Sequence, residues 1–181
     1  MLARHTTVYT SPPFGGFLLV VLILLAVAQG YQESRLDQSA RGPTGAIGIM
    51  QILPATAQDP NVDIDNIEKA ENNIQAGMKY LDYLRSRYFS DPGMDRTNRT
   101  LMALAAYNVG PARMIELRSK AEQQGYDPNI WFDNVELVAA KEIGRGPVQY
   151  VANIVKYYTA YRNAITTLAA RDTAREEAGI D

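Results

Sequence analysis

Apolar residues recur every three or four positions along most of this chain, and no stretch alternates apolar with polar residues as a strand would. The clearest stripe consists of Ile67, Ala70, Ile74, Gly77, Leu81, Leu84 and Tyr88. It stops before Asp91-Pro92-Gly93, a combination typical of a turn. The periodicity therefore predicts an all-α fold.

Four more helices are expected after this stripe. They cover residues 101–107, 111–125 and 131–143, and a long segment that begins at Pro147. Pro111 and Pro147 suit the first turn of a helix, where the missing amide N–H costs no hydrogen bond. Residues 169–181 form a charged tail, which we expect to fray from Arg171 onward. With 181 residues, 46% of them hydrophobic, the chain suits one domain with short connections.

Composition excludes several classes of function. The formal net charge is -2 and the basic residues are scattered, so nucleic acid is not an expected partner. The chain has no cysteine, and its single histidine, His5, lies in the leader. Thiol chemistry, zinc sites and histidine triads are therefore excluded. Acid and base chemistry by carboxylates remains.

Residues 17–28 form an unbroken run of 12 apolar residues behind a leader, residues 1–16, of unclear role. Three interpretations stay open. The run could be a signal peptide cleaved after Ala26-Val27-Ala28, which would leave Glu33 almost at the new N-terminus. It could be a membrane anchor, although a span needs about 20 residues. We favour the third, a buried helix that is apolar on all sides and carries Glu33 at its C-terminal end.

Glu33 is the first candidate for a catalytic carboxylate. Taken alone it would be an ordinary solvated glutamate. The apolar run before it, however, predicts a hydrophobic environment, and desolvation raises the pKa of a carboxyl group toward the value a general acid needs. Asp37, four residues later, would share a helix face with Glu33 if the helix continued. We expect instead that Asp37 caps or turns the loop.

The stretch from Gly42 to Gly48 is too rich in glycine for a helix and could be no more than a turn. Alternatively, its glycines let the backbone approach a sugar closely, while Met50 and Gln51 offer an apolar surface and an amide. Spacing alone does not decide between the two. The same ambiguity holds for three further residues, which by themselves read as core or helix ends: Tyr107, Asn108 and Tyr150.

Taken in order, these blocks resemble the catalytic domain of the soluble lytic transglycosylase type, a relative of goose-type lysozyme. The resemblance runs from about Leu24 to Tyr158 and is specific because of the order of its motifs. Within this family, the motifs look most similar to those of the membrane-bound lytic murein transglycosylase F branch. The motifs are Glu33-Ser34, Gly45-Ala46-x-Gly48-x-Met50-Gln51, Pro54-x-Thr56-Ala57, Asn73-Ile74-x-x-Gly77-x-x-Tyr80-Leu81, Ala105-Ala106-Tyr107-Asn108-x-Gly110-Pro111 and Tyr150-Val151.

The resemblance implies a lysozyme-like helical domain over residues 17–168 that cleaves peptidoglycan glycan strands without water. The bond cleaved is the β-1,4 link between N-acetylmuramic acid and N-acetylglucosamine, and a 1,6-anhydro ring closes on the muramyl unit. Glu33 is implied as the sole catalytic residue, first acid and then base, and no metal or cofactor is implied. Substrate contacts are implied for Ser34, Gly45, Met50, Gln51, Tyr107, Asn108 and Tyr150.

Two alternatives remain beside the transglycosylase. One is a hydrolase of the same fold, such as a lysozyme or chitinase, which would need a second carboxylate; Asp37, Asp63 and Asp65 are the candidates. The other is a peptidoglycan-binding protein without turnover. F-type relatives carry a binding domain ahead of the catalytic one, so the resemblance also implies a fragment or a truncated version.

The implied substrate, peptidoglycan, predicts a location in the cell envelope, and we expect the periplasm. Association with a membrane through the apolar segment is a further option.

Overall fold

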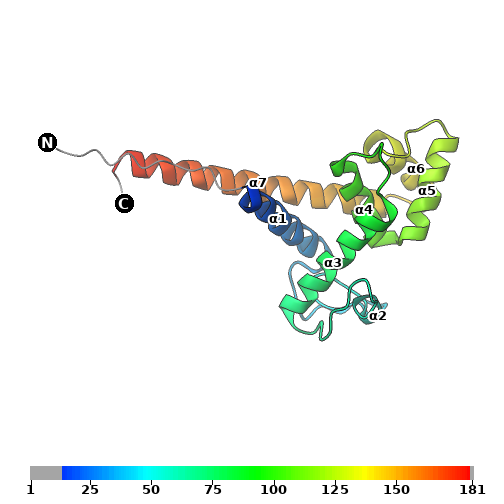
Figure 1. Ribbon diagram of the computed structural model, residues 1–181, viewed down its shortest axis with the longest axis horizontal. Coiled ribbons are helices and arrows are strands. Elements are labelled where there is room, and N and C mark those ends of the chain that lie inside the picture. The colour runs from blue at the N-terminus through cyan, green and yellow to red at the C-terminus, as the bar shows by residue number, and fades with distance from the viewer. Residues whose placement is uncertain (1–13, 180–181) are drawn as a thin grey trace.

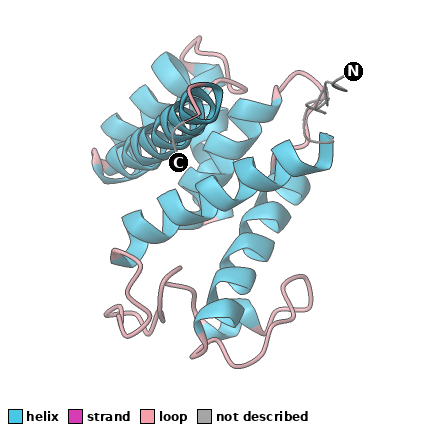
Figure 2. Cartoon of the chain, turned by 90° about the vertical axis from the view of Figure 1, so that its left-hand side faces the viewer, coloured by secondary structure: helices cyan, strands magenta, loops and turns pink. Residues whose placement is uncertain are grey.

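The computed structural model describes residues 14–179, and this part of the chain contains helices and loops but no strand (Figures 1 and 2). The predicted all-α fold is confirmed. Its elements are α1 (Phe14–Ser34), α2 (Pro54–Ala57), α3 (Ala70–Tyr88), α4 (Arg96–Val109), α5 (Pro111–Gln123), the π-helical turn η1 (Trp131–Val135), α6 (Glu136–Ile143) and α7 (Gly146–Glu177).

Helix α4 lies at the centre of the main core. Residues 101–106 are all buried, and the helix packs against α3, α5 and α7. It begins at Arg96, five residues before the predicted start, because the Asp95 side chain caps it by accepting a hydrogen bond of 2.8 Å from the Asn98 amide. The apolar pattern marked only the buried part of this helix.

Two further predictions differ from the structure. The segment 131–143 is not one regular helix, because Phe132 and Asp133, which lie within η1, have non-helical dihedral angles and kink the chain before α6. Helix α7 continues to Glu177 rather than ending in a frayed tail, since its last turns are rich in alanine, arginine and glutamate, which favour helix. The outer part of α7 extends away from the other helices (Figure 1). Neither residue 17 nor residue 168 marks a break, since α1 and α7 run through them.

Helix α1 packs mainly against α7, where the rings of Tyr31 and Tyr157 meet edge to face with centroids 4.8 Å apart. Helix α1 carries Glu33 near its C-terminal end, but it is not the helix buried on all sides that the favoured interpretation describes. Among the side chains described from Val20 onward, Val20, Leu22 and Ile23 are 44%, 45% and 52% exposed, and the first buried one is Leu24. Over the described part of the chain, no helix has both the length and the apolar character needed to cross a membrane. Residues 1–13, most of the predicted leader, lie outside the described residues.

The loops between α1 and α3 form a second, smaller core over one face of α3. Isolated bridges join Ile47 to Arg41 and to Ile52, so the glycine-rich stretch is folded back on itself. Five residues fill this core: Ile52, Ala57, Val62, Ile67 and Ala76. The glycine-rich loop is therefore held beside the end of α1, where Glu33 lies.

Candidate active site

Glu33 lies in the last turn of α1, and the backbone just beyond it ends the helix sharply. Arg35 and Leu36 adopt left-handed conformations with φ of 62° and 66°. The Leu36 amide donates to the Gly30 carbonyl at 3.3 Å, and the Arg35 amide donates to the Tyr31 carbonyl at 3.1 Å. These bonds satisfy carbonyls that a helix end leaves without partners. The carboxyl group is thus carried by a well-defined helix terminus.

A tyrosine from the other end of the chain contacts this carboxyl group directly. The Tyr150 hydroxyl, on the first turns of α7, donates a hydrogen bond of 2.5 Å to Glu33 Oε1. Tyr150 is buried in the main core, and 117 positions separate the two residues. The site therefore exists only where the end of α1 meets the start of α7.

Burial raises the pKa of Glu33 from 4.5 to about 7, and the hydrogen bond from Tyr150 opposes this rise by stabilising the carboxylate. At neutral pH both the protonated and the ionised form are thus populated. A group in this condition can give a proton to one atom and take a proton from another within one reaction. The pKa of Glu33 is raised, which is the direction predicted from the apolar residues before it in the sequence.

Tyr107, on α4, links Glu33 to the glycine-rich loop. Its hydroxyl donates to the Met50 carbonyl at 2.8 Å. Burial and the nearby charge of Glu33 hold the pKa of Tyr107 well above 10, and the same two causes raise the pKa of Tyr150. Both phenols therefore stay neutral beside the carboxyl group and can act as hydrogen-bond donors.

The glycine-rich loop is fixed against α1 and α3 by close packing around Met50. A Cβ added at Gly77 would lie 2.6 Å from the Met50 Cβ, and one added at Gly30 would lie 2.8 Å from a methyl carbon of Ile49. Only glycine permits this approach of the loop to both helices. The Ser34 hydroxyl adds a hydrogen bond of 3.0 Å to the Ile49 carbonyl.

The structure brings some of the predicted site residues together and leaves others apart. Glu33, Tyr107 and Tyr150 form one cluster, and the backbone of Met50 joins it while the Met50 side chain is fully buried. Ser34 and Gln51 bind backbone carbonyls near the loop. Gly45 and Asn108 are exposed. Contact of these residues with a substrate stays a prediction.

Sequence reasoning missed Gln29, which is fully buried one helical turn before Glu33. Among the described residues its amide makes no hydrogen bond within normal geometry, although it lies near enough to Tyr150 to lower that residue's pKa. The spacing of four residues placed Gln29 and Glu33 on one helix face and could have indicated this position.

Within the described residues no second carboxylate shifts the pKa of Glu33, because the two causes of the shift are burial, which raises the pKa, and the hydrogen bond from Tyr150, which lowers it. Asp37 is exposed and turns the loop, where its carboxylate accepts hydrogen bonds from the amide and hydroxyl of Ser39. Since α1 ends at Ser34, Asp37 does not share a helix face with Glu33. Asp63 and Asp65 are also exposed. Across residues 14–179, no cluster of three His, Cys, Asp or Glu side chains could hold a metal ion.

Replacing Tyr150 by phenylalanine should extend activity to higher pH. The variant removes the hydrogen bond that lowers the pKa of Glu33, so this pKa should rise above about 7 and the acid form should persist to higher pH. The measurement is the rate of glycan cleavage between pH 5 and pH 9. Tyr161→Phe, in the outer part of α7, is the matched control. An alkaline limit that stays in place in Tyr150→Phe would contradict the role of this hydrogen bond.

Comparison with known proteins agrees with this geometry. Residues 20–130 match the family model described as the transglycosylase SLT domain. Over 147 residues, or 74% of this chain, similar proteins include membrane-bound lytic murein transglycosylase F 1 of Alkalilimnicola ehrlichii at 38% identity and the F enzymes of Marinobacter nauticus at 37% and Pseudomonas fluorescens at 35%. The match covers only 28–29% of each relative, so the chain spans less than a third of their length. The resemblance predicted from the motifs is confirmed, and the chain belongs to the SLT transglycosylase domain family.

Proposed function

We propose that this domain is a peptidoglycan lytic transglycosylase and that Glu33 is its catalytic residue. It would cleave the β-1,4 bond between N-acetylmuramic acid and N-acetylglucosamine and leave a 1,6-anhydromuramic acid end. The observation that carries this proposal is a partly buried carboxyl group with a pKa of about 7, in contact with one tyrosine and without a carboxylate partner among the described residues. The names of the relatives, lytic murein transglycosylases, support the same reaction.

The reaction needs two proton transfers, and one carboxyl group can perform both. Protonated Glu33 gives its proton to the glycosidic oxygen as the bond from that oxygen to C1 of the muramyl unit breaks. The carboxylate that results is stabilised by the hydrogen bond from Tyr150. It then removes the proton of the C6 hydroxyl while the C6 oxygen bonds to C1. Glu33 ends protonated as it began, and no water is consumed.

The hydrolase alternative has less support. Lysozyme-type hydrolysis usually uses a second carboxylate about 5–9.5 Å from the first, on the far side of the sugar. Asp37, Asp63 and Asp65 are exposed, and none of them perturbs the pKa of Glu33. The binding-protein alternative is opposed by the raised pKa of Glu33, because a site that only binds has no need of a carboxyl group poised near pH 7.

Mass spectrometry of the soluble fragments released from purified peptidoglycan tests this proposal. Anhydromuramic acid ends are the expected product. Reducing ends, which are heavier by one water, would identify a hydrolase, and no release of fragments would favour the binding protein.

We also propose that the protein acts in the cell envelope and that α1 attaches it to a lipid surface.

 
Peptidoglycan lies outside the cytoplasmic membrane, and the relatives are named membrane-bound. Val20, Leu22 and Ile23 present apolar surface on the first half of α1, and apolar side chains on a helix surface favour insertion at the boundary of a bilayer.

Association with lipid is expected to depend on these exposed side chains. The double variant Leu22→Ser and Ile23→Ser should reduce the fraction of protein that sediments with phospholipid vesicles. Ile115→Ser, which changes an apolar residue of similar exposure on α5, is the matched control. Equal sedimentation of all three proteins would contradict the proposed attachment through α1.

A further inference from the structure

Gln29 is a polar side chain at a fully buried position of α1, beside the core residue Ala28. Neither its amide nitrogen nor its amide oxygen has a partner of normal hydrogen-bond geometry among the described residues. The buried amide of Asn73, in contrast, binds three backbone groups. A buried polar group without partners destabilises a folded chain, and an apolar side chain of the same size would avoid this cost. Packing therefore does not explain the amide of Gln29.

The position of Gln29 on its helix offers an explanation. Residues four apart on a helix lie on one face, so Gln29 and Glu33 share a face of α1. The Tyr150 hydroxyl, on α7, donates a hydrogen bond of 2.5 Å to Glu33 Oε1. The Gln29 side chain lies beside the same hydroxyl, since it is one of the groups that lower the pKa of Tyr150. The carboxyl group and the amide therefore both face the Tyr150 hydroxyl.

The Tyr150 hydroxyl can use an amide donor. A phenol oxygen can accept a hydrogen bond while its own hydrogen is donated, and here that hydrogen goes to Glu33. Donation from Gln29 Nε2 to the Tyr150 oxygen would direct the hydroxyl hydrogen toward Glu33 and strengthen the bond that it makes. Hydrogen bonds of a catalytic site are often long or misaligned before substrate binds and tighten afterwards. The geometry of Gln29 agrees with such a contact.

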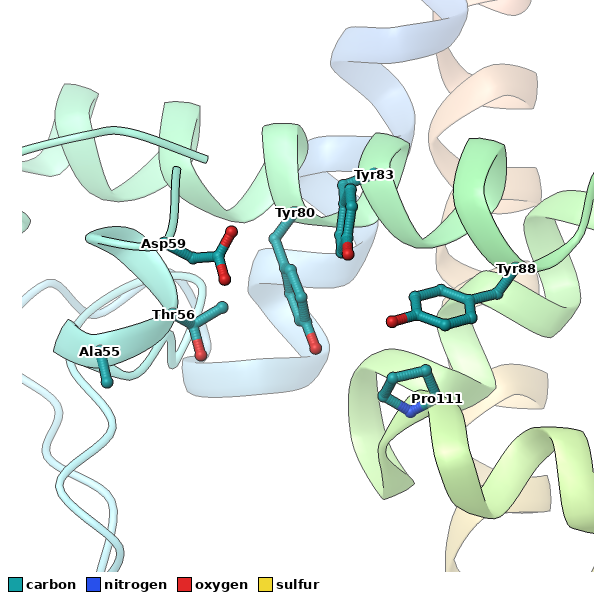
Figure 3. Close-up of a pocket in the computed structure, with 7 residues that line it drawn as sticks. All are labelled: Ala55, Thr56, Asp59, Tyr80, Tyr83, Tyr88 and Pro111. Atoms are coloured by element: carbon teal, nitrogen blue, oxygen red, sulfur yellow. The ribbon is translucent and has the colours of Figure 1, made fainter. Parts of the chain in front are cut away.

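The other groups near the Tyr150 hydroxyl do not take this place. Its titratable neighbours are Glu33 on α1 and Tyr107 on α4, and no charged side chain among the described residues adds to the shift in the pKa of Glu33. Tyr107 gives its hydrogen to a backbone carbonyl of the glycine-rich loop. The Tyr107 ring lies 5.3 Å from that of Tyr80, which borders a cavity of about 300 Å³ (Figure 3), but Gln29 does not line this cavity.

We propose that Gln29 is a positioning residue that acts through Tyr150. Its amide donates to the Tyr150 oxygen and directs the hydroxyl at the carboxylate that remains after Glu33 has given up its proton. This inference rests on the proposed function, because it assigns Gln29 a part in the reaction of Glu33. The chain retains a destabilising buried amide because the amide favours the ionised form of the catalytic group, and functional sites commonly keep groups of this kind.

Gln29→Met tests the proposal, since methionine has a similar volume and no amide. At its pH optimum the variant should release anhydromuramic acid ends about tenfold more slowly than the wild type, because the carboxylate formed in the first step is less well stabilised. Its alkaline limit should move to higher pH, as expected for Tyr150→Phe but by less. Its resistance to urea should equal or exceed that of the wild type, because an amide without partners leaves the core.

A double variant shows whether Gln29 acts through Tyr150. In a Tyr150→Phe parent, Gln29→Met should not move the alkaline limit further, because no hydroxyl remains to be directed. Gln123→Met, at an exposed position in the last turn of α5, is the matched control and should keep the rate and the pH profile of the wild type.

Three results would overturn the assignment of Gln29. They are a wild-type rate and alkaline limit in Gln29→Met, an equal shift of the limit in both parents, and a slower rate that comes with an unmoved limit and lower resistance to urea. The last of these would indicate a purely structural role. Failure of the proposed function is seen separately, as the absence of anhydro ends among the products of the wild-type protein.

Discussion

Glu33→Gln should lower the rate at which anhydromuramic acid ends are released by about a thousandfold, because an amide neither gives nor removes the proton that each step requires. Glutamine has nearly the same shape and keeps an oxygen that can accept the hydrogen bond from Tyr150. Binding of glycan should therefore persist. The rate is measured by mass spectrometry of the fragments released from peptidoglycan. Glu71→Gln, at an exposed position in the first turn of α3, is the matched control and should keep full activity.

The free energy of unfolding of Glu33→Gln should rise relative to that of the wild type as the pH rises. Folding raises the pKa of Glu33 from 4.5 to about 7, so the folded state holds the proton more tightly than the unfolded state does. The stability that goes with this proton is fully present below pH 4.5 and is lost as the pH rises to 7. One pH unit between two pKa values is worth about 1.4 kcal/mol, so the wild type loses up to about 3 kcal/mol by pH 8.

Glutamine does not titrate, and Glu33→Gln should escape this loss. The measurement is urea unfolding of both proteins at pH 4 and at pH 8. The difference between their free energies of unfolding should move in favour of the variant at the higher pH. A difference that does not change with pH would show that Glu33 has an ordinary pKa in the folded protein.

Asn73→Asp should have the largest effect on stability, a loss of about 3–5 kcal/mol. The side chain of Asn73 is completely buried under the glycine-rich loop. Its amide group donates to the carbonyls of Ile47 at 2.8 Å and Ile67 at 3.1 Å, and its oxygen accepts from the Met50 amide at 2.8 Å. Aspartate keeps the acceptor but turns a second oxygen toward two carbonyl groups. Both carbonyls would lose their donor inside the protein.

Urea unfolding measures this loss, and the rate of glycan cleavage provides a second readout. Activity should fall as well, because Met50 presents its carbonyl to Tyr107 from the loop that Asn73 holds. Asn72→Asp is the matched control on the same helix. Asn72 is less buried and donates only to the Asp65 carbonyl. A similar loss of stability in both variants would contradict the special position of Asn73.

Much of the fold could be predicted because local sequence patterns indicate where its helices begin and end. The apolar stripe and the turn at Asp91 marked α3, and Pro111 marked the start of α5. The break at Asp133 could not be predicted in this way, since the left-handed conformation of that residue, with φ of 59°, interrupts a segment whose apolar pattern continues. The capped start of α4 was missed because its first turn is polar and exposed.

The candidate active site was predictable only in part. The motif order pointed to Glu33, and the apolar run before it indicated the direction in which its pKa moves. The contact with Tyr150 depends on how α1 crosses α7, and no pattern within either helix specifies that crossing. Tyr80, Tyr83 and Tyr88 line a cavity beside α3, and no pattern within α3 predicts that these tyrosines stay partly exposed. Their exposure is decided by the α2 segment and α5, which lie opposite them.

The hydrogen bond between Glu33 and Tyr150 has a consequence for a newly made chain. The raised pKa of Glu33 requires the tertiary structure, because burial where α1 meets α7 causes it. In an unfolded or half-folded chain the same carboxyl group has an ordinary pKa and is ionised at neutral pH. Such a chain has no proton to give to a glycosidic bond. If Glu33 is the proton donor that we propose, it can act only in the folded protein, where burial at the meeting of α1 and α7 has raised its pKa.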